Sequence, residues 1–219
     1  MEQMEQLEQL EEKLKQARAA RKSNLVASAR NLYNLILQED SSHSEASFFS
    51  AYYTITEGDS SELYDCYMKF ADVIMFSIIG CSIASDKELL QDMAACVKRL
   101  PTLVFNKMDR IVCETHLGED RARLESANLH SIGNLYFFGD MVEQFYASND
   151  AIINEIAVDM WKEAIKLQRQ WVGVPYDEGN PREYADKIKK YDPKYVLPKE
   201  NVLRKFLARA ILFLSRFGQ

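Results

Sequence analysis

Residues 29–59 of the chain read ARNLYNLILQEDSSHSEASFFSAYYTITEGD, and this stretch decides the fold. Ala29, Tyr33 and Ile36 recur at the spacing of one face of an α-helix. The polar run at residues 40–44 breaks that pattern, and apolar periodicity resumes in the EASFFSAYYTITE segment that follows. Two short helices joined by such a turn pack antiparallel. The stretch therefore predicts a helical hairpin.

The turns at the ends of this hairpin resemble those of tetratricopeptide repeats. In that consensus, Asp-Pro follows the second helix of a unit, and the next unit ends its first helix at Gly-Asp. Here Asp40 is followed by Ser41 instead of proline, and Gly58-Asp59 supplies the second signature. Another helix end is indicated at Tyr191-Asp192-Pro193, because a residue before proline is pushed out of the helical conformation. Ser41 and Pro193 are 152 residues apart. This is not a multiple of the roughly 34-residue repeat, so the repeat is degenerate.

Two further segments extend the resemblance, AVDMWKEAIKLQ at residues 157–168 and KIKKYDPKY at residues 187–195. With the hairpin, they resemble a family of uncharacterised bacterial tetratricopeptide-like proteins, some of which carry an N-terminal zinc ribbon. That ribbon is missing here. The resemblance implies an all-α fold of degenerate antiparallel helical hairpins, with about seven to nine helices.

Composition supports a helical chain. Of 219 residues, 47% are hydrophobic, which is enough for a sizeable core. There are eight glycines and five prolines, and four of the prolines lie between residues 175 and 198. We divide the chain into a charged helical extension (1–22), a helical repeat-like body (23–172), a Pro- and Gly-containing connection with a short helix (173–199), and an amphipathic C-terminal helix (200–219).

The extension carries Leu7, Leu10, Leu14 and Ala17 at the alternating spacing of a short coiled-coil seam. Two heptads leave two interpretations open. The helix is either an exposed extension leaning on the first hairpin, or a surface for self-association.

Further helices are expected in the body. The predicted ranges are residues 60–80, 86–117, 119–147, 151–172 and 182–190. The second of these contains Pro101, which either kinks one helix or sits in the first turn of a new one, and we expect the kink.

Charge is distributed unevenly along the chain. The formal net charge of −6 argues against a general nucleic-acid binder, because phosphate contacts require a basic surface. Residues 182–219 carry ten Lys or Arg against four Asp or Glu, so a basic tail follows an acidic body.

The basic tail ends in an amphipathic pattern at residues 200–217, with basic residues on one side and apolar residues on the other. Such a helix closes the core, docks on a partner, or lies on an anionic membrane surface. Closing the core is the commonest outcome in a solenoid. If the helix instead docks on a partner, Arg204, Phe206 and Arg209 are candidate contacts.

No catalytic or cofactor motif is visible in the sequence. There is no nucleophile elbow, P-loop or Gly-rich dinucleotide turn, so we expect no enzyme activity and no cofactor. Cys113 and His116 share a Cys-x-x-His spacing, but no second pair of ligands follows, so we expect no metal. The four cysteines show no CxxC and are expected to be reduced core residues.

The N-terminal residues MEQMEQLEQLEE have neither a basic start nor an apolar core, unlike a signal peptide. We therefore expect a cytoplasmic protein whose mature chain begins at Met1. The longest uncharged run, residues 73–85, is shorter than the roughly 20 apolar residues of a spanning helix, which predicts a buried helix instead.

Recognition by shape is the function that remains. We expect an adaptor or scaffold that binds a protein or peptide, with a self-assembling structural protein and a membrane-peripheral protein as alternatives. Phe48, Phe49, Tyr52 and Tyr53 crowd one helix. Either one or two of them are exposed as partner contacts, or all four pack between neighbouring helices.

Overall fold

The computed structural model describes residues 2–57, 60–80, 87–115, 118–146, 150–170 and 179–199. Within these ranges the chain forms eight α-helices and no strand, which confirms the all-α expectation and the expected number of helices. The helices are α1 (Glu2–Lys22), α2 (Val26–Glu39), α3 (Ser44–Glu57), α4 (Ser60–Gly80), α5 (Lys87–Thr115), α6 (Gly118–Tyr146), α7 (Ala151–Gln170) and α8 (Pro181–Tyr191).

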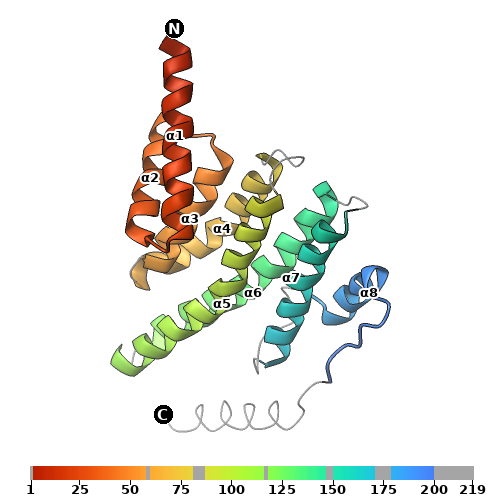
Figure 1. Cartoon of the computed structure of the whole chain (residues 1–219). Coiled ribbons are helices and arrows are strands. Elements are labelled where there is room, and N and C mark those ends of the chain that lie inside the picture. The colour runs from red at the N-terminus through yellow and green to blue at the C-terminus, as the bar shows by residue number, and fades with distance from the viewer. Residues whose placement is uncertain are drawn as a thin grey trace.

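The helices pack largely in chain order, and the main departure from that order is at α4 (Figure 1). α1, α2 and α3 stand together at the N-terminal end, and α4 crosses below them. α4 then packs far more extensively on α6 than on α5, while α5 and α6 form a long antiparallel pair. α7 lies on α6, and α8 lies on α7. The order is therefore that of stacked hairpins only up to α4.

The first hairpin forms as its sequence predicts. Ala29, Tyr33 and Ile36 are the buried face of α2. The turn that follows is closed by Asp40, whose Oδ1 accepts hydrogen bonds from the backbone N–H of Ser42 at 2.9 Å and from its hydroxyl at 2.6 Å. The bonds from Ser42 lower the pKa of Asp40 below its usual value. An Asx-type turn at Asp40 thus ends α2 at the place where the repeat consensus has Asp-Pro.

The connection from α1 to α2 is short and well defined. Asn24 adopts a positive φ of 55°, and the backbone N–H of Leu25 donates to the carbonyl of Ala20 at 2.9 Å. The N–H of Asn24 donates to the carbonyl of Arg21 at 3.0 Å. These bonds make a Schellman motif, which satisfies the last carbonyls of α1 and reverses the chain. α1 is therefore held antiparallel to α2.

Pro101 lies inside α5 and is buried. The helix runs unbroken from Lys87 to Thr115, so the alternative in which Pro101 begins a new helix is wrong. The helix ends at Glu39 and Tyr191 agree with the turn signals that follow them.

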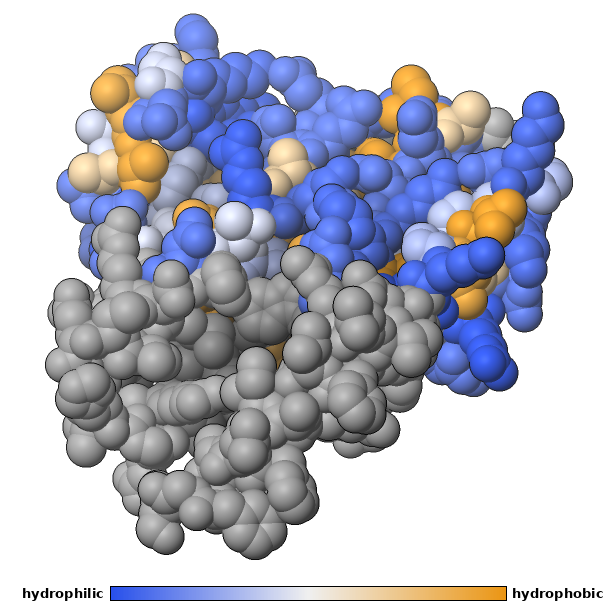
Figure 2. Space-filling model, turned by 90° about the horizontal axis from the view of Figure 1, so that it is seen from below, coloured by the Kyte–Doolittle hydropathy of each residue, from blue (hydrophilic) through white to orange (hydrophobic). Residues whose placement is uncertain are grey.

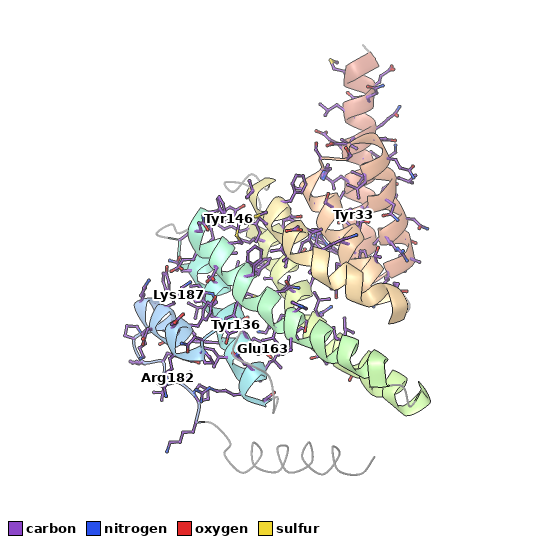
Figure 3. All side chains as sticks on the ribbon, turned by 180° about the vertical axis from the view of Figure 1, so that it is seen from behind. Tyr33, Tyr136, Tyr146, Glu163, Arg182 and Lys187 are labelled. Carbon is purple, nitrogen blue, oxygen red and sulfur yellow. The ribbon has the colours of Figure 1, made fainter. Side chains whose placement is uncertain are left out.

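The hydrophobic side chains form a core cluster that extends from α1 to α8. Its largest buried members include Trp161, Tyr33 and Tyr136. Figure 3 shows Tyr33 in the N-terminal group of helices and Tyr136 in the C-terminal group. The basal part of α1 belongs to this cluster, because Ala17 and Ala20 are buried in it.

The described surface is largely hydrophilic where it is seen from below, with hydrophobic residues in small separate groups (Figure 2). Among the described helices, none combines the length and the apolar character needed to cross a bilayer. The turn predicted at Gly58-Asp59 and the helix predicted at residues 200–217 lie outside the described residues.

Candidate functional site

The C-terminal turns of α1 are anchored by one buried carboxylate. Glu45 lies in the first turn of α3, and its side chain is only 3% exposed. Arg18 donates to it through Nε at 3.1 and 3.0 Å and through Nη2 at 2.5 Å, and Arg21 donates through Nη1 at 3.1 Å. The Tyr33 hydroxyl donates to the same carboxylate at 3.0 Å. A buried charge is tolerated only when it is paired and hydrogen-bonded, and these contacts meet that condition.

Arg21 and Lys22 also tie α1 to α5. Nη2 of Arg21 donates to Asp92 at 2.6 Å, and its guanidinium carbon lies 4.0 Å from the centre of the Phe49 ring. Lys22 pairs with Glu88 at 2.6 Å, and this hydrogen bond lowers the pKa of Glu88. Basic residues in the last turn of α1 thus meet acidic residues near the starts of α3 and α5, which the helix dipoles favour.

The N-terminal part of α1 extends past the helix against which it packs. α1 has 21 residues and α2 has 14. At a rise of about 1.5 Å per residue they measure about 31 Å and about 21 Å. Lys13 pairs with Glu39, the last residue of α2, which marks where the overlap ends. We call residues 2–12 the distal half of α1 and residues 13–22 the basal half. Figure 1 shows α1 rising above α2 and α3.

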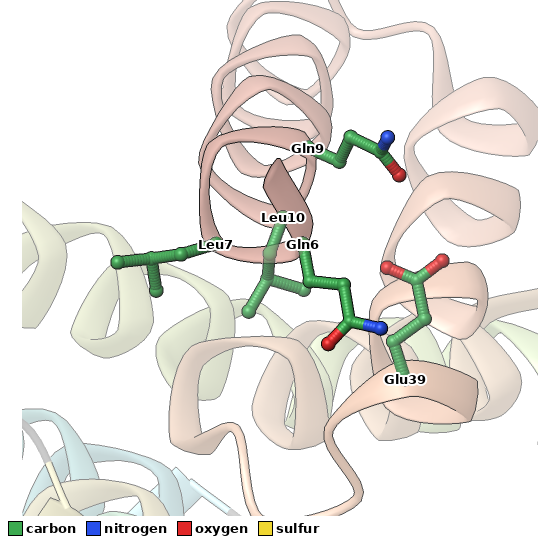
Figure 4. A pocket seen from close by; sticks show the side chains of 5 residues that line it. All are labelled: Gln6, Leu7, Gln9, Leu10 and Glu39. Carbon is green, nitrogen blue, oxygen red and sulfur yellow. The ribbon is translucent and has the colours of Figure 1, made fainter. Parts of the chain in front are cut away.

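A hollow of about 530 Å³ lies beside the distal half (Figure 4). It is lined by Gln6, Leu7, Gln9 and Leu10 from α1 and by Glu39 from α2. Leu10 is partly buried against the core, whereas Leu7 is 58% exposed. The apolar side of α1 therefore continues out of the core and into a concave part of the surface. We call this hollow, with the distal half of α1, the distal groove.

The distal groove is strongly acidic. Residues 2–12 contain five glutamates and neither lysine nor arginine. Glu5 and Glu8 are exposed, and Met4 between them and the N-terminus is 67% exposed. Exposed apolar side chains among negative charges favour a partner that is both apolar and basic, because unlike potentials attract and like potentials repel.

The seam predicted along α1 packs against the core from Leu10 onward and is exposed at Leu7. Leu14 is partly buried and Ala17 is fully buried, so the basal half leans on the first hairpin as expected. Leu7 faces solvent in the single chain. Self-association through the distal half remains a prediction.

The four aromatic residues offered by the sequence as partner contacts are core residues. Phe48 and Phe49 are 0% exposed, Tyr52 is 7% exposed and Tyr53 is 6% exposed. Phe48 packs edge-on against Phe49, with their ring centres 5.1 Å apart. Of the two alternatives, the packing of all four between neighbouring helices is confirmed and the exposure of one or two is wrong, because α2, α4 and α5 all pack on α3 and cover them. The other predicted contacts, Arg204, Phe206 and Arg209, lie outside the described residues.

A second carboxylate attaches α8 at the other end of the molecule. Asp140 on α6 accepts hydrogen bonds from the Trp161 indole at 3.1 Å, the Tyr184 hydroxyl at 2.7 Å and the Lys187 ammonium at 2.7 Å. The ammonium also lies 5.3 Å from the centre of the Trp161 ring and 4.9 Å from that of Tyr184. Lys187 is therefore held by ion pairs with Asp140 and, at 3.8 Å, with Glu143, and by two cation–π contacts.

Two glycines allow this packing. A Cβ atom on Gly139 would lie 2.5 Å from Nε1 of Trp161, so only glycine lets α7 approach α6 this closely. Gly179 has a φ of 156°, and a Cβ atom there would lie 2.8 Å from the Tyr136 ring. The Tyr136 hydroxyl donates to Gln168 at 2.7 Å, and Gln168 in turn donates to the carbonyl of Gly179 at 3.0 Å. These bonds fix the segment that leads into α8.

Among the described residues, Cys96 is a free cysteine. Burial raises the pKa of the Cys96 thiol to about 12, so this thiol is protonated and weakly nucleophilic at neutral pH. Among the described residues, no three or more His, Cys, Asp or Glu side chains are grouped to hold a metal ion. The predicted Cys113 and His116 lie among the side chains that are not described.

No protein-family model matches this chain, and neither a curated protein nor a solved structure matches it. Sequence reasoning identified Leu7 and Leu10 of the distal groove through their seam spacing. It missed Gln6, Gln9 and Glu39, because the hollow depends on how far α1 outreaches α2. The available signals for that overhang were the turn after Lys22 and the turn signal at Asp40, which together limit the length of α2.

Proposed function

We propose that this chain is a non-catalytic, cytoplasmic helical adaptor that binds a protein segment in the distal groove. The observation that supports it is the placement of exposed Leu7 beside a hollow of about 530 Å³, on a helix whose other end is anchored in the core. A rigid base beneath an exposed contact surface lowers the ordering cost of binding.

The bound segment is expected to be a helix. Leu7 and Leu10 are spaced by three residues, as in the first two positions of a coiled-coil seam. Their helix is already formed and projects from the body, so a second helix can lie along it with its apolar side in the hollow. Gln6, Gln9 and Glu39 supply polar groups at the rim.

Site-specific crosslinking tests this function. A photo-reactive benzoylphenylalanine replaces Leu7 in one variant and Phe76 in a control variant, because Phe76 on α4 is also an exposed apolar residue, at 45%. We expect a saturable adduct with one defined protein segment at position 7, which a Leu10→Glu substitution removes. Adducts of equal yield at both positions, or adducts that survive Leu10→Glu, would contradict the proposal.

A further inference from the structure

We infer that the segment bound in the distal groove is residues 200–219 of a second copy of this chain. This inference rests on the proposed function and names its partner. Three observations support it. The groove at one end of the molecule is acidic, and residues 200–219 have a basic amphipathic sequence. The groove also lies far in the fold from residue 199, after which this segment begins.

The groove supplies negative charge around an apolar floor. Glu5 and Glu8 are exposed on the distal half, and Leu7 and Leu10 line the hollow. Residues 2–12 contain neither lysine nor arginine, Lys13 pairs with Glu39, and Lys15 pairs with Glu12 at the base of the distal half, so Glu5 and Glu8 keep their negative charge at the surface. The partner that best fits this surface carries positive charges beside a row of apolar side chains.

Residues 200–219 have that composition. They contain four basic residues and one acidic residue, giving a net charge of +3. Apolar residues recur among them at spacings of three and four, at Leu203, Phe206, Leu207, Ala210, Leu214 and Phe217. This is the periodicity of a helix with one apolar side. Its basic residues match the glutamates of the groove in sign, and its apolar side matches Leu7 and Leu10.

The arrangement of the helices favours docking between copies. The last described residues, 195–199, follow α8, and the carbonyl of Pro198 accepts a hydrogen bond from Arg169 near the end of α7. The distal half of α1 lies at the opposite end of the molecule, beyond α2 and α3 (Figures 1 and 3). The described chain thus ends far from its own groove (Figure 1), and this separation favours the groove of a neighbouring copy.

Docking of one copy's tail in the next copy's groove is a head-to-tail contact. Such heterologous contacts make closed rings or open chains of molecules, because an open assembly keeps one unused groove at one end and one unused tail at the other until the ring closes. The contact is charge-dependent, so it weakens as salt shortens the range of electrostatic attraction.

Charge reversal in the full-length chain tests the inference. The groove variant carries Glu5→Lys and Glu8→Lys, and the tail variant carries Arg204→Glu and Arg209→Glu. A control variant carries Glu57→Lys and Glu155→Lys, the same change in charge at exposed positions away from the groove. Mass in solution is followed by light scattering as protein concentration and salt are varied.

We expect the wild-type chain and the control to reach at least about twice the single-chain mass at low salt and to return to single chains near 1 M salt, where the screening length is about 3 Å. Each reversal variant alone stays a single chain. An equal mixture of the groove and tail variants regains the larger mass, because the unchanged acidic groove of the tail variant then meets the unchanged basic tail of the groove variant. Loss of folding cannot produce that recovery.

A wild-type chain that stays monomeric at every concentration would overturn the inference, as would a mixture that fails to associate. A tail variant that loses binding to anionic phospholipid vesicles, while wild-type mass stays that of one chain, would assign the tail to a membrane instead. A crosslink from position 7 to a different protein would overturn this inference and leave the proposed function standing.

Discussion

The two end helices, α1 and α8, are attached to the body by the same device in two settings. At the α1 end, Glu45 is 3% exposed and accepts from two arginines and a tyrosine. At the α8 end, Asp140 is 33% exposed and accepts from a lysine, a tyrosine and a tryptophan. In each case one carboxylate collects donors from helices that are distant in sequence.

The two carboxylates differ in their exposure to solvent. Water screens and partly replaces the partners of a carboxylate at the surface, whereas a carboxylate in the core depends wholly on its protein donors. The α1 end is therefore the more costly one to disturb. The proposed contact surface on the distal half of α1 requires a basal half that is held firmly in this way.

The largest effect is expected from Glu45→Gln. The substitution keeps the size of the side chain but removes the buried counter-charge of Arg18 and Arg21, while Arg21 keeps its pair with Asp92 and Arg18 is partly exposed, so we expect the free energy of unfolding to fall by about 3 kcal/mol. Urea denaturation measures it, with the exposed Glu155→Gln as control. A loss below about 1 kcal/mol would mean that Glu45 behaves as a surface charge does.

Gly139→Ala tests the packing beneath the α8 site. Alanine usually stabilises a helix relative to glycine by about 1 kcal/mol. Here the added Cβ would lie 2.5 Å from the Trp161 indole, so we expect a net loss of about 1–3 kcal/mol and a changed tryptophan fluorescence. An increase in stability would show that α6 and α7 separate at little cost.

Asp140→Asn tests whether the attachment of α8 depends more on salt than the attachment of α1. We expect a loss of about 1–2 kcal/mol, because a charge-assisted hydrogen bond to Lys187 is weakened while the size of the side chain is kept. Since Asp140 is partly exposed, this loss should shrink in 1 M salt, whereas the loss from Glu45→Gln should not. Equal salt dependence at the two sites would remove the distinction drawn between them.

Alkaline pH should weaken both ends. Burial raises the pKa of Tyr33 beside Glu45 and of Tyr136 beside α8 above the value of about 10 in an unfolded chain. Their contribution to stability is therefore complete below pH 10 and is lost as the pH rises above it. Above pH 10, each of these two tyrosines lowers the free energy of unfolding by about 1.4 kcal/mol per pH unit. Urea denaturation at pH 9 and 11 checks the slope, which Tyr33→Phe and Tyr136→Phe should each reduce. An unchanged slope in Tyr33→Phe would show that this hydroxyl ionises in the folded state.

Local parts of the fold were predictable from the sequence. The α2–α3 hairpin follows from apolar spacing and the Asp40 turn, and the end of α8 follows from Tyr191-Asp192-Pro193. α8 also begins at a readable signal, since the side chain of Asn180 accepts from the backbone N–H of Arg182 at 3.0 Å. Each of these depends on residues within a few positions of one another.

The candidate site was predictable only in part. Leu7 and Leu10 were visible as a seam, but which half of it is buried depends on the lengths of α1 and α2. Glu45 collects donors 24 and 27 residues away, a separation that no local pattern encodes. The aromatic cluster around Tyr52 was taken as a candidate surface because spacing alone does not show how many helices cover α3.

Hydrogen exchange along α1 tests most directly whether the distal groove binds the tail of a second copy. It is measured by mass spectrometry at low ionic strength, at one low and one high protein concentration. We predict that the basal half is protected at both, because Arg18 and Arg21 hold it in the core, and that residues 4–12 gain protection only at the high concentration. Equal exchange of residues 4–12 at both concentrations would contradict a distal groove that binds the tail of a second copy.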